Sequence, residues 1–153
     1  MKQLIAFAAI LFCSTALGQR YVKTFNTLND AYNANLKDVH TNIFILGRSS
    51  ASDGGGGMFY YDSSSTSTNL GTVFGNVYGG RVKRVYPSSY VEAAWFGAKS
   101  DGVTDATAAI QSAIDTVGYG TVQLEGTNVV SNLVIKKGIV LKGHNKWNTT
   151  LKA

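Results

Sequence analysis

The sequence predicts a mainly β protein, in which a small α+β module is followed by a β-solenoid, a coil of short parallel strands stacked rung on rung. Two observations favour this fold class. From residue 121 onward, apolar residues come in short bursts separated by Gly, Asn or Lys-Gly turns. Upstream, residues 19–90 mix one short helical pattern with several strand-like runs, and the boundary lies near Pro87, the only proline.

The first 18 residues have the organisation of a secretory signal peptide. A basic second residue precedes an apolar run from Leu4 to Cys13, and small residues follow as far as Gly18. This order predicts cleavage before Gln19. The run is shorter than the ~20 apolar residues that cross a bilayer, and the bulky Phe12 disfavours a lipoprotein signal at Cys13. We therefore expect a soluble, exported mature protein that is not inserted in a membrane.

Cysteine content and charge exclude several classes of site. Cys13 is the only cysteine, so the mature chain would contain no disulfide, reactive thiolate or cysteine-based metal site. The formal net charge is +5, but the basic residues are scattered. Nucleic-acid binding is not expected, because it favours a basic face interleaved with stacking aromatics. The two local basic clusters are predicted to be solvated strand faces: Arg81, Lys83 and Arg84, and Lys136 with Lys137.

The module of residues 19–90 begins with a short amphipathic helix in NTLNDAYNANLKD. Thr27 stands at the N-cap position and Asp30 three residues later, as in a capping box. The apolar residues that follow recur at helical spacing. The face predicted to be apolar contains Leu28, Ala31, Tyr32 and Leu36.

Strand-like runs make up the rest of this module. Residues 43–46 in NIFILG form a continuous apolar run ended by glycine, which predicts a buried strand. MFYYD, GTVFG and GGRVKRVY indicate three more strands. Glycines 54–57 lack the following helix and the lysine that a phosphate-binding loop needs, so they are interpreted as a wide turn.

The clearest helix lies in DATAAIQSAIDTV, where apolar residues are spaced three and four apart along one side. Thr104 is the expected N-cap, and Asp105 in the first turn faces the positive end of the helix dipole. Glycines 118 and 120 end the helix. The predicted buried face comprises Ala106, Ala109, Ile110, Ala113, Ile114 and Val117.

The bursts after this helix predict short strands at residues 121–124, 128–130, 133–135, 139–141 and 149–152. They are too short for independent hairpins and too close together for crossover helices, so we expect parallel strands that bury their inner faces against one another. A stable solenoid needs about three repeats and caps. Residues 91–153 are therefore interpreted as an incomplete β-helix whose open end pairs with further rungs or with another copy of the chain.

A family resemblance rests on WFGAKSDGVTDATAAIQSAID and the following GTVQLEGTNVVSNLVIKKGIVLKGHNKWNTTLK. This segment, about residues 91–152, resembles the N-terminal signature of the pectate-lyase-like superfamily, which includes rhamnogalacturonase-like, epimerase-like and tailspike-like proteins. Upstream, FILGRSSASDGGGGMFYY and GGRVKRVY are similar to the small module that often precedes the signature in tailspike-like proteins. The sequence departs from the pattern at Ala106, which is commonly acidic, at LEGTN, which replaces a proline-rich turn, and at Val82, where an aromatic is expected.

The resemblance implies a right-handed parallel β-helix whose N-terminal end is covered by the signature helix. Asp101 is expected to serve the Asp-Gly turn and Asp105 the helix start. The alternative is a carboxylate pair for acid/base catalysis or for Ca²⁺. The residues to which the resemblance assigns this capping, structural role are Phe96, Gly97, Asp101, Gly102, Thr104, Asp105 and Thr107.

The resemblance also implies a chemistry, but it assigns no catalytic residue here. Family members cleave acidic or complex polysaccharides by hydrolysis or β-elimination, often with Ca²⁺, using groups on the middle rungs. No motif of this chain matches those groups, and Glu125 and His144 are interpreted as turn residues without a catalytic partner. We expect no metal site and no cofactor on this chain, with Ca²⁺ left open for the full-length family protein, and no glycan cleavage by the isolated chain.

Two functions remain open. The first is the N-terminal part of a secreted polysaccharide-degrading β-helix protein, with catalysis on other residues. The second is a non-catalytic glycan-binding or adaptor module of tailspike type, in which aromatic rings stack on sugars. A signal peptide favours a secreted cellular protein. The expected partners are a polysaccharide and a second copy of the chain, and the aromatic candidates for glycan contact are Tyr60, Tyr61, Tyr78 and Trp95.

Overall fold

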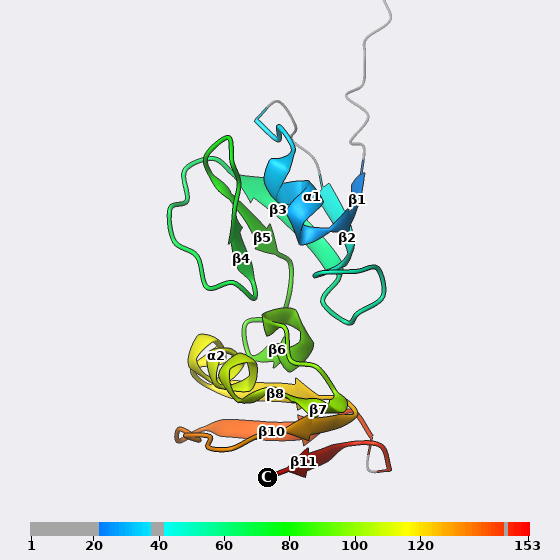
Figure 1. The fold of residues 1–153 in the computed structure, drawn as a ribbon. Helices are drawn as coiled ribbons and strands as arrows, with labels where there is room; N and C mark the ends of the chain where they lie inside the picture. Colours follow the sequence, from blue (N-terminus) through cyan, green and yellow to red (C-terminus); the bar gives the residue numbers. More distant parts are fainter. Residues whose placement is uncertain (1–21, 38–41, 146) are drawn as a thin grey trace, which may run out of the picture.

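The computed structural model describes residues 22–37, 42–145 and 147–153. The predicted signal peptide, residues 1–18, lies outside these ranges. The described part is mainly β, as predicted, with two α-helices and one short 3₁₀ helix (Figure 1). The elements in chain order are β1 Lys23–Thr27, α1 Leu28–Asn33, β2 Asn42–Gly47, β3 Gly57–Asp62, β4 Val73–Gly75, β5 Arg81–Arg84, β6 Tyr90–Glu92, η1 Ala93–Phe96, β7 Asp101–Asp105, α2 Thr107–Val117, β8 Gly120–Leu124, β9 Thr127–Val129, β10 Ile139–Gly143 and β11 Thr150–Lys152.

Strands β1 to β5 form one sheet in the order β1-β2-β3-β5-β4, which we call the N-terminal module. β1 and β2 run parallel and α1 connects them, whereas the other neighbours are antiparallel. A parallel pair needs such a crossover connection because its strands cannot be joined by a tight turn. The core of this module consists of Ala31, Leu36, Ile43, Ile45, Phe59 and Val82.

Helix α1 begins as the sequence predicts. The hydroxyl of Thr27 accepts a hydrogen bond from the Asp30 amide at 3.2 Å, and the Asp30 carboxylate accepts one from the Thr27 amide at 2.9 Å. This capping box satisfies amides that the first turn leaves without helical partners. The helix ends at Asn33, so Leu36 reaches the core from beyond it, and Tyr32 is 45% exposed instead of buried.

Strand β2 is a strand as predicted, but it is not buried on both sides. Its side chains alternate between the core and solvent: Ile43 and Ile45 are buried, whereas Phe44 and Leu46 are more than one-third exposed. Side chains of successive strand residues point to opposite faces of a sheet. Helix α1 covers only one face of this sheet, so the apolar run includes two residues on the other face.

Strands β6 to β11 form two parallel three-stranded sheets, β6-β8-β10 and β7-β9-β11, which we call the parallel-strand module. The stacking is in register, with Val91 opposite Val122 and Val122 opposite Leu141. The predicted parallel stacking of short strands is therefore confirmed, although the strands of residues 90–145 and 147–152 form two sheets without closing a helix. β6 and β7 are additional to the predicted strands, and residues 133–135 are not a strand.

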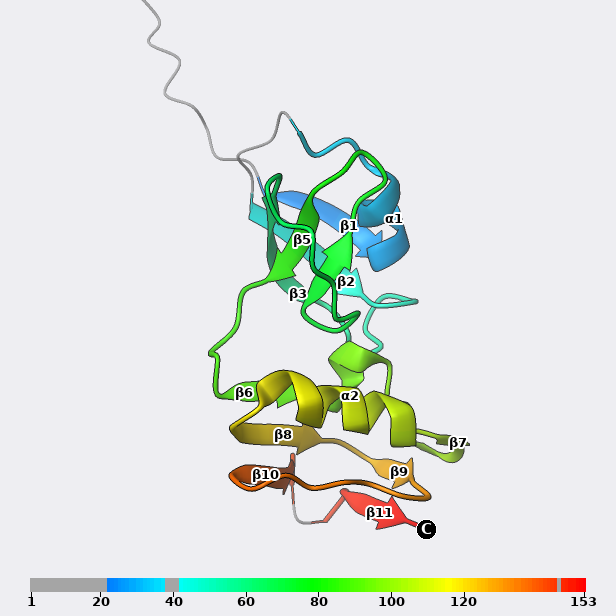
Figure 2. The same cartoon turned by 90° about the vertical axis from the view of Figure 1, so that its left-hand side faces the viewer.

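Helix α2 packs its predicted apolar side against the first rungs. Ile110 and Ile114 are fully buried in a core shared with Val91, Val122 and Leu124. Figure 2 shows α2 lying along β6 and β8, on the side that faces the N-terminal module. None of the helices in the described ranges has the length and apolar character needed to cross a membrane.

The start of α2 differs from the prediction. The helix begins at Thr107, its N-cap position is Ala106, and both Thr104 and Asp105 belong to β7. The alanine cannot cap, but the Asp105 carboxylate accepts a hydrogen bond from the Thr107 amide at 2.8 Å. Asp105 thus stabilises the helix start from one residue before the N-cap, and the Thr104 side chain forms a hydrogen bond in the preceding turn instead.

Candidate functional site

The signature segment places its two acidic residues in local backbone structure. The Asp101 carboxylate accepts hydrogen bonds from the Val103 amide at 2.9 Å, the Thr104 amide at 2.7 Å and the Thr104 hydroxyl at 2.7 Å. The Thr104 hydroxyl and these amides lower the pKa of Asp101 to about 2. Thr107 lowers the pKa of Asp105 in the same way. Both carboxylates are ionised at neutral pH and already hydrogen-bonded within their own turns.

The other signature residues stabilise turns and a contact between modules. Gly97 ends η1 with a φ of 93°, and Gly102 has a φ of 73°; both are in the left-handed region that glycine adopts without strain. Phe96 is 8% exposed. Its ring packs so closely on Gly71 that a Cβ atom there would lie 2.1 Å from Phe96 Cε1.

The structure does not bring the aromatic candidates for glycan contact together. Tyr60 is 43% exposed on the face of the N-terminal sheet that α1 leaves open. Tyr61, the next residue of β3, points to the opposite face, where its hydroxyl donates to Gly79 O at 2.9 Å. Trp95 is 7% exposed, with the rings of Tyr86 and Tyr90 against its edge. Tyr78, in the loop before β5, is 47% exposed, so Tyr60 and Tyr78 present the most accessible of the four rings, and glycan contact remains a prediction.

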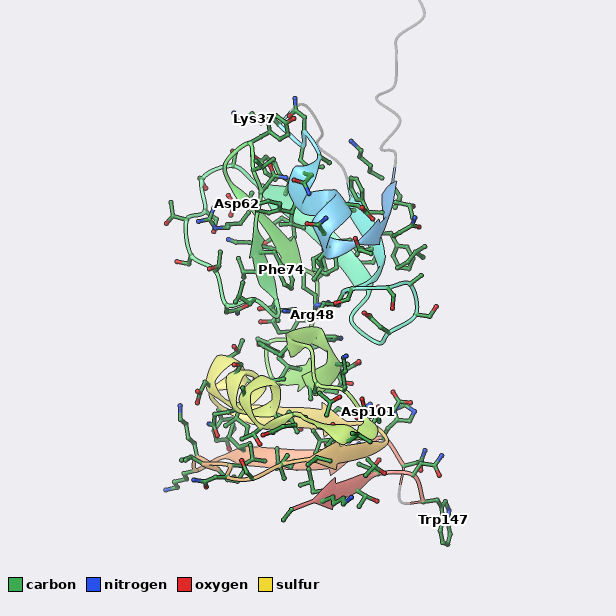
Figure 3. All side chains as sticks on the ribbon, in the orientation of Figure 1. Lys37, Arg48, Asp62, Phe74, Asp101 and Trp147 are labelled. Carbon is green, nitrogen blue, oxygen red and sulfur yellow. The ribbon has the colours of Figure 1, made fainter. Side chains whose placement is uncertain are left out.

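Two arginines lie where the modules meet: Arg48, which the sequence analysis did not single out, and Arg84, which it placed in a solvated basic cluster. Figure 3 shows Arg48 between the N-terminal module and the parallel-strand module. Its Nη1 donates to Trp95 O at 2.8 Å and also to Leu70 O. Arg84 is 5% exposed, so the prediction of a solvated face for its cluster is wrong at this residue. It alternates with the outward Lys83 on β5 and therefore points into the interior.

A groove of about 600 Å³ runs beside this junction. Its walls are the β2–β3 loop, the segment from η1 to β7 and the turn between β8 and β9. Asp53 and Asp101 on these walls already accept backbone hydrogen bonds, whereas Lys99 and Glu125 are exposed. The charged side chains of the groove lining are thus of both signs, Lys99 being near enough to Asp101 to add to the lowering of its pKa by Thr104, and the lining residues include no aromatic ring. The lining residues are Ser52, Asp53, Gly54, Ala93, Ala94, Ala98, Lys99, Ser100, Asp101, Glu125 and Asn128.

The remaining candidates have local partners. The ring Nδ1 of His144 is 2.8 Å from Nε2 of Gln123, which is on the neighbouring strand β8. The carbonyl of Glu125 accepts from Asn128 Nδ2 at 2.8 Å, and this buried asparagine holds the turn to β9. In the described ranges, no three or more His, Cys, Asp or Glu side chains are grouped closely enough to hold a metal ion.

Two family models match the chain, one for each module. Residues 21–87 match the small four-stranded β-sheet domain of phage tail proteins. Residues 90–153 match the rhamnogalacturonase A/epimerase, pectate-lyase-like family. Residues 90–153 are thus a pectate-lyase-like segment preceded by a phage-tail-type sheet module, as the resemblance to tailspike-like proteins predicts. No match was found among curated proteins.

Solved tailspike structures resemble this pectate-lyase-like chain over both modules. The enzymatically active domain of tailspike protein 2 from bacteriophage CBA120 is 27% identical, with a TM-score of 0.65, over 85% of this chain and 19% of that one. The tailspike protein of Acinetobacter baumannii phage AM24 is 30% identical, with a TM-score of 0.59, over 72% of this chain and 18% of that one. The chain thus spans less than a quarter of either protein.

A third structure supports the fold alone. The tailspike protein gp49 of Acinetobacter baumannii bacteriophage Fri1, described as a capsular polysaccharide depolymerase, is 19% identical with a TM-score of 0.68. The match covers 80% of this chain and 23% of that protein. The arrangement of a small sheet module followed by parallel strands is therefore shared at low sequence identity.

Proposed function

We propose that the chain forms the N-terminal part of an exported, tailspike-like protein that degrades polysaccharide, and that this part does not itself catalyse cleavage. The single observation that carries the proposal is the similarity of both modules, in order, to the enzymatically active domain of a phage tailspike at 27% identity. The match of residues 90–153 to the rhamnogalacturonase A/epimerase, pectate-lyase-like family supports a polysaccharide as the substrate class.

The geometry of the acidic residues supports a structural, non-catalytic role for this N-terminal part of the protein. Asp101 and Asp105 have depressed pKa values and accept hydrogen bonds from neighbouring amides. A glycosidase needs one carboxyl group with a raised pKa to protonate the leaving oxygen, opposite a second carboxylate. Groups of that kind would lie on other rungs of the full-length protein, as would any Ca²⁺ site.

The proposal includes a structural role for α2. Its apolar side covers the first parallel strands, where an uncovered solenoid would expose apolar interior and unpaired edges. We propose that α2 is the cap of a right-handed parallel β-helix. The contacts of Ile110 and Ile114 with the core of β6 and β8 support this role.

The test is a cleavage assay with the purified chain on pectin, rhamnogalacturonan and bacterial capsular polysaccharides. New reducing ends report hydrolysis, and unsaturated sugar products, which absorb in the ultraviolet, report β-elimination. We expect neither above the blank. Turnover by the purified chain, abolished by Asp101→Asn or Glu125→Gln, would contradict the proposal and relocate the active site to the groove between the modules.

A non-catalytic glycan-binding module is the second candidate, and the exposed ring of Tyr60 favours it. Tyr60 is the ring to test first because it stands on the open face of the sheet, where an aromatic face can contact a sugar. If the module binds glycan through this face, Tyr60→Ala should weaken binding at least about tenfold by calorimetry. Tyr119→Ala, which removes a 76% exposed ring from the other module, is the matched control and should change nothing.

A further inference from the structure

The two modules meet at a joint built around one buried arginine. The guanidinium carbon of Arg84, on β5, lies 4.4 Å from the centre of the Phe59 ring and 4.4 Å from the centre of the Trp95 ring. Phe59 belongs to the N-terminal module and Trp95 to the parallel-strand module. The same cation therefore interacts with an aromatic ring from each module, and both contacts are desolvated, which strengthens a cation–π interaction.

Hydrogen bonds fix this guanidinium in place. Nη2 donates to Gly55 O at 2.7 Å, Nη1 donates to Gly56 O, and Nε approaches Gly71 O at 3.5 Å. These carbonyls belong to two loops of the N-terminal module, before β3 and before β4. Burial lowers the pKa of Arg84 to about 10, so the group remains charged at neutral pH. A buried charge is tolerated when its donors are satisfied in this way.

A second arginine crosses the same joint. Arg48 follows β2 directly, and its Nη1 donates to the Trp95 carbonyl at 2.8 Å. Its guanidinium also lies 5.7 Å from the centre of the Phe74 ring in the N-terminal module. Trp95 is thus held twice, by its ring through Arg84 and by its backbone through Arg48.

Glycines allow the two backbones to approach without intervening side chains. A Cβ atom at Gly71 would lie 2.1 Å from Phe96, and one at Gly54 would lie 3.1 Å from the Ala94 Cβ. Phe96 and Ala94 both belong to η1. The 3₁₀ helix therefore packs directly against the loops of the N-terminal module that contain Gly54 and Gly71. This close contact leaves little room for the modules to rotate about the connecting residues 85–89.

We propose that this joint locks the N-terminal module and the parallel-strand module into one rigid body, with Arg84 as the residue that couples them. Relative motion is the ordinary behaviour of neighbouring modules unless their interface is extensive and apolar. Here a shared cation and close backbone contact make the interface rigid. Any partner bound by the N-terminal module is consequently held at a fixed angle to the strand axis.

The first measurement is the rotational diffusion of the wild-type chain in solution. ¹⁵N relaxation of the purified chain should fit a single rotational diffusion tensor for amides of both modules. Two separate correlation times, each close to the value for a module of that mass, would overturn the proposal without any variant.

Four single substitutions then test the joint itself. Arg84→Lys keeps the positive charge but loses the planar, multiply donating group, and Arg81→Lys makes the same change on the same strand, where the arginine bonds only to carbonyls within its own module. Gly71→Ala inserts a methyl group against Phe96. Gly75→Ala is its control, since a Cβ there would make only ordinary contact, 3.6 Å from Tyr32.

Trp95 provides a second readout at the joint. The chain contains two tryptophans, so Trp147→Phe, at a residue 82% exposed, leaves Trp95 as the only one. In this background Arg84→Lys and Gly71→Ala should separate the correlation times of the modules and raise acrylamide quenching of Trp95 severalfold. The Arg81 and Gly75 controls should leave both readouts unchanged. A single tensor retained in Arg84→Lys and Gly71→Ala would refute the coupling, and if one variant fails to fold, the other and the wild type still decide.

Discussion

Charged side chains in this molecule bind mainly to the backbone. The Asp53 carboxylate accepts hydrogen bonds from four amides in the β2–β3 loop, and Asp101 accepts two amides in its own turn. Arg84 and Arg48 donate in turn to backbone carbonyls. Charged groups thus organise loops that contain little apolar side chain. Hydrogen bonds lower the pKa of Asp101, whereas burial lowers the pKa of Arg84 and of Arg48.

Asp101 leads to a pH-dependent prediction. Its folded pKa is about 2, below the ordinary value of about 3.9, so its ionised form stabilises the fold above the ordinary pKa. This contribution should be lost as the pH falls through about 2. We expect Asp101→Asn to lower the urea midpoint at pH 6, and the difference from wild type to shrink towards zero at pH 2.

Glu125→Gln is the matched control for this measurement, because it neutralises an exposed carboxylate in the next turn of the same module. Its urea midpoint should follow that of the wild type at both pH values. An Asp101→Asn deficit that stays constant from pH 6 to pH 2 would mean that the loss is steric and unrelated to ionisation.

At the scale of elements, the sequence predicts the helices and strands whose apolar periodicity or turn residues extend over several positions. The buried side of α2, the capping box of α1 and the parallel stacking of β8 with β10 follow from periodicity and turn residues. β6 is three residues long, and β7 includes the Asp-Gly turn, so neither has a pattern of its own. Their pairing depends on partners some 25 to 30 residues away in the chain, Val122 and Thr127.

The failed strand at residues 133–135 has an identifiable cause. The amide of Val134 donates to Gln111 Oε1 at 2.9 Å, and its carbonyl accepts from Gln111 Nε2 at 3.3 Å. Three residues earlier, the Ser131 amide donates to the Thr107 hydroxyl at 2.9 Å. Side chains of α2 therefore take the hydrogen bonds that a neighbouring strand would make, and local apolar content gives no sign of this.

The packing of α2 gives a stability prediction. Ile114 is fully buried between the helix and the first rungs, so Ile114→Ala should destabilise the fold by about 2–5 kcal/mol, through lost burial and the cavity that remains. Chemical denaturation monitored by circular dichroism measures this cost. Ile135→Ala removes the same atoms from a side chain that is 48% exposed, and should cost within about 0.5 kcal/mol. Equal costs at the two sites would show that α2 does not rest on the rungs as described.

At the scale of the whole molecule, composition predicts two modules but not how they join. The cluster RVKR indicates a charged strand face, yet alternation sends Arg84 inward to Trp95. Gly71 and Gly54 look like ordinary loop glycines until Phe96 and Ala94 are placed against them. A contact between modules depends on which residues meet in three dimensions, and no local sequence pattern predicts this. The groove beside the contact could not be predicted from the sequence for the same reason.

The far end of the parallel-strand module offers a surface for self-association. A hollow of about 440 Å³ is bordered by Leu124, Leu141 and Leu151, and Leu151 is 44% exposed. Beside it, the Thr149 hydroxyl is buried with no hydrogen-bond partner in the described part of the chain. An apolar surface next to strand edges is suited to pairing with more strands. We propose that copies of the isolated chain associate through this end, the surface that further rungs would cover in the full-length protein.

Sedimentation velocity over a range of concentrations measures this association. Leu151→Lys places a charge on the apolar border, where desolvation opposes contact, and should raise the dissociation constant at least about tenfold. Leu46→Lys makes the same change at a similarly exposed leucine of β2, on the open face of the N-terminal sheet. If Leu46→Lys abolishes association and Leu151→Lys does not, the copies meet through the N-terminal sheet. The β10–β11 end would then pair with something other than a second copy, because Leu151 there is 44% exposed.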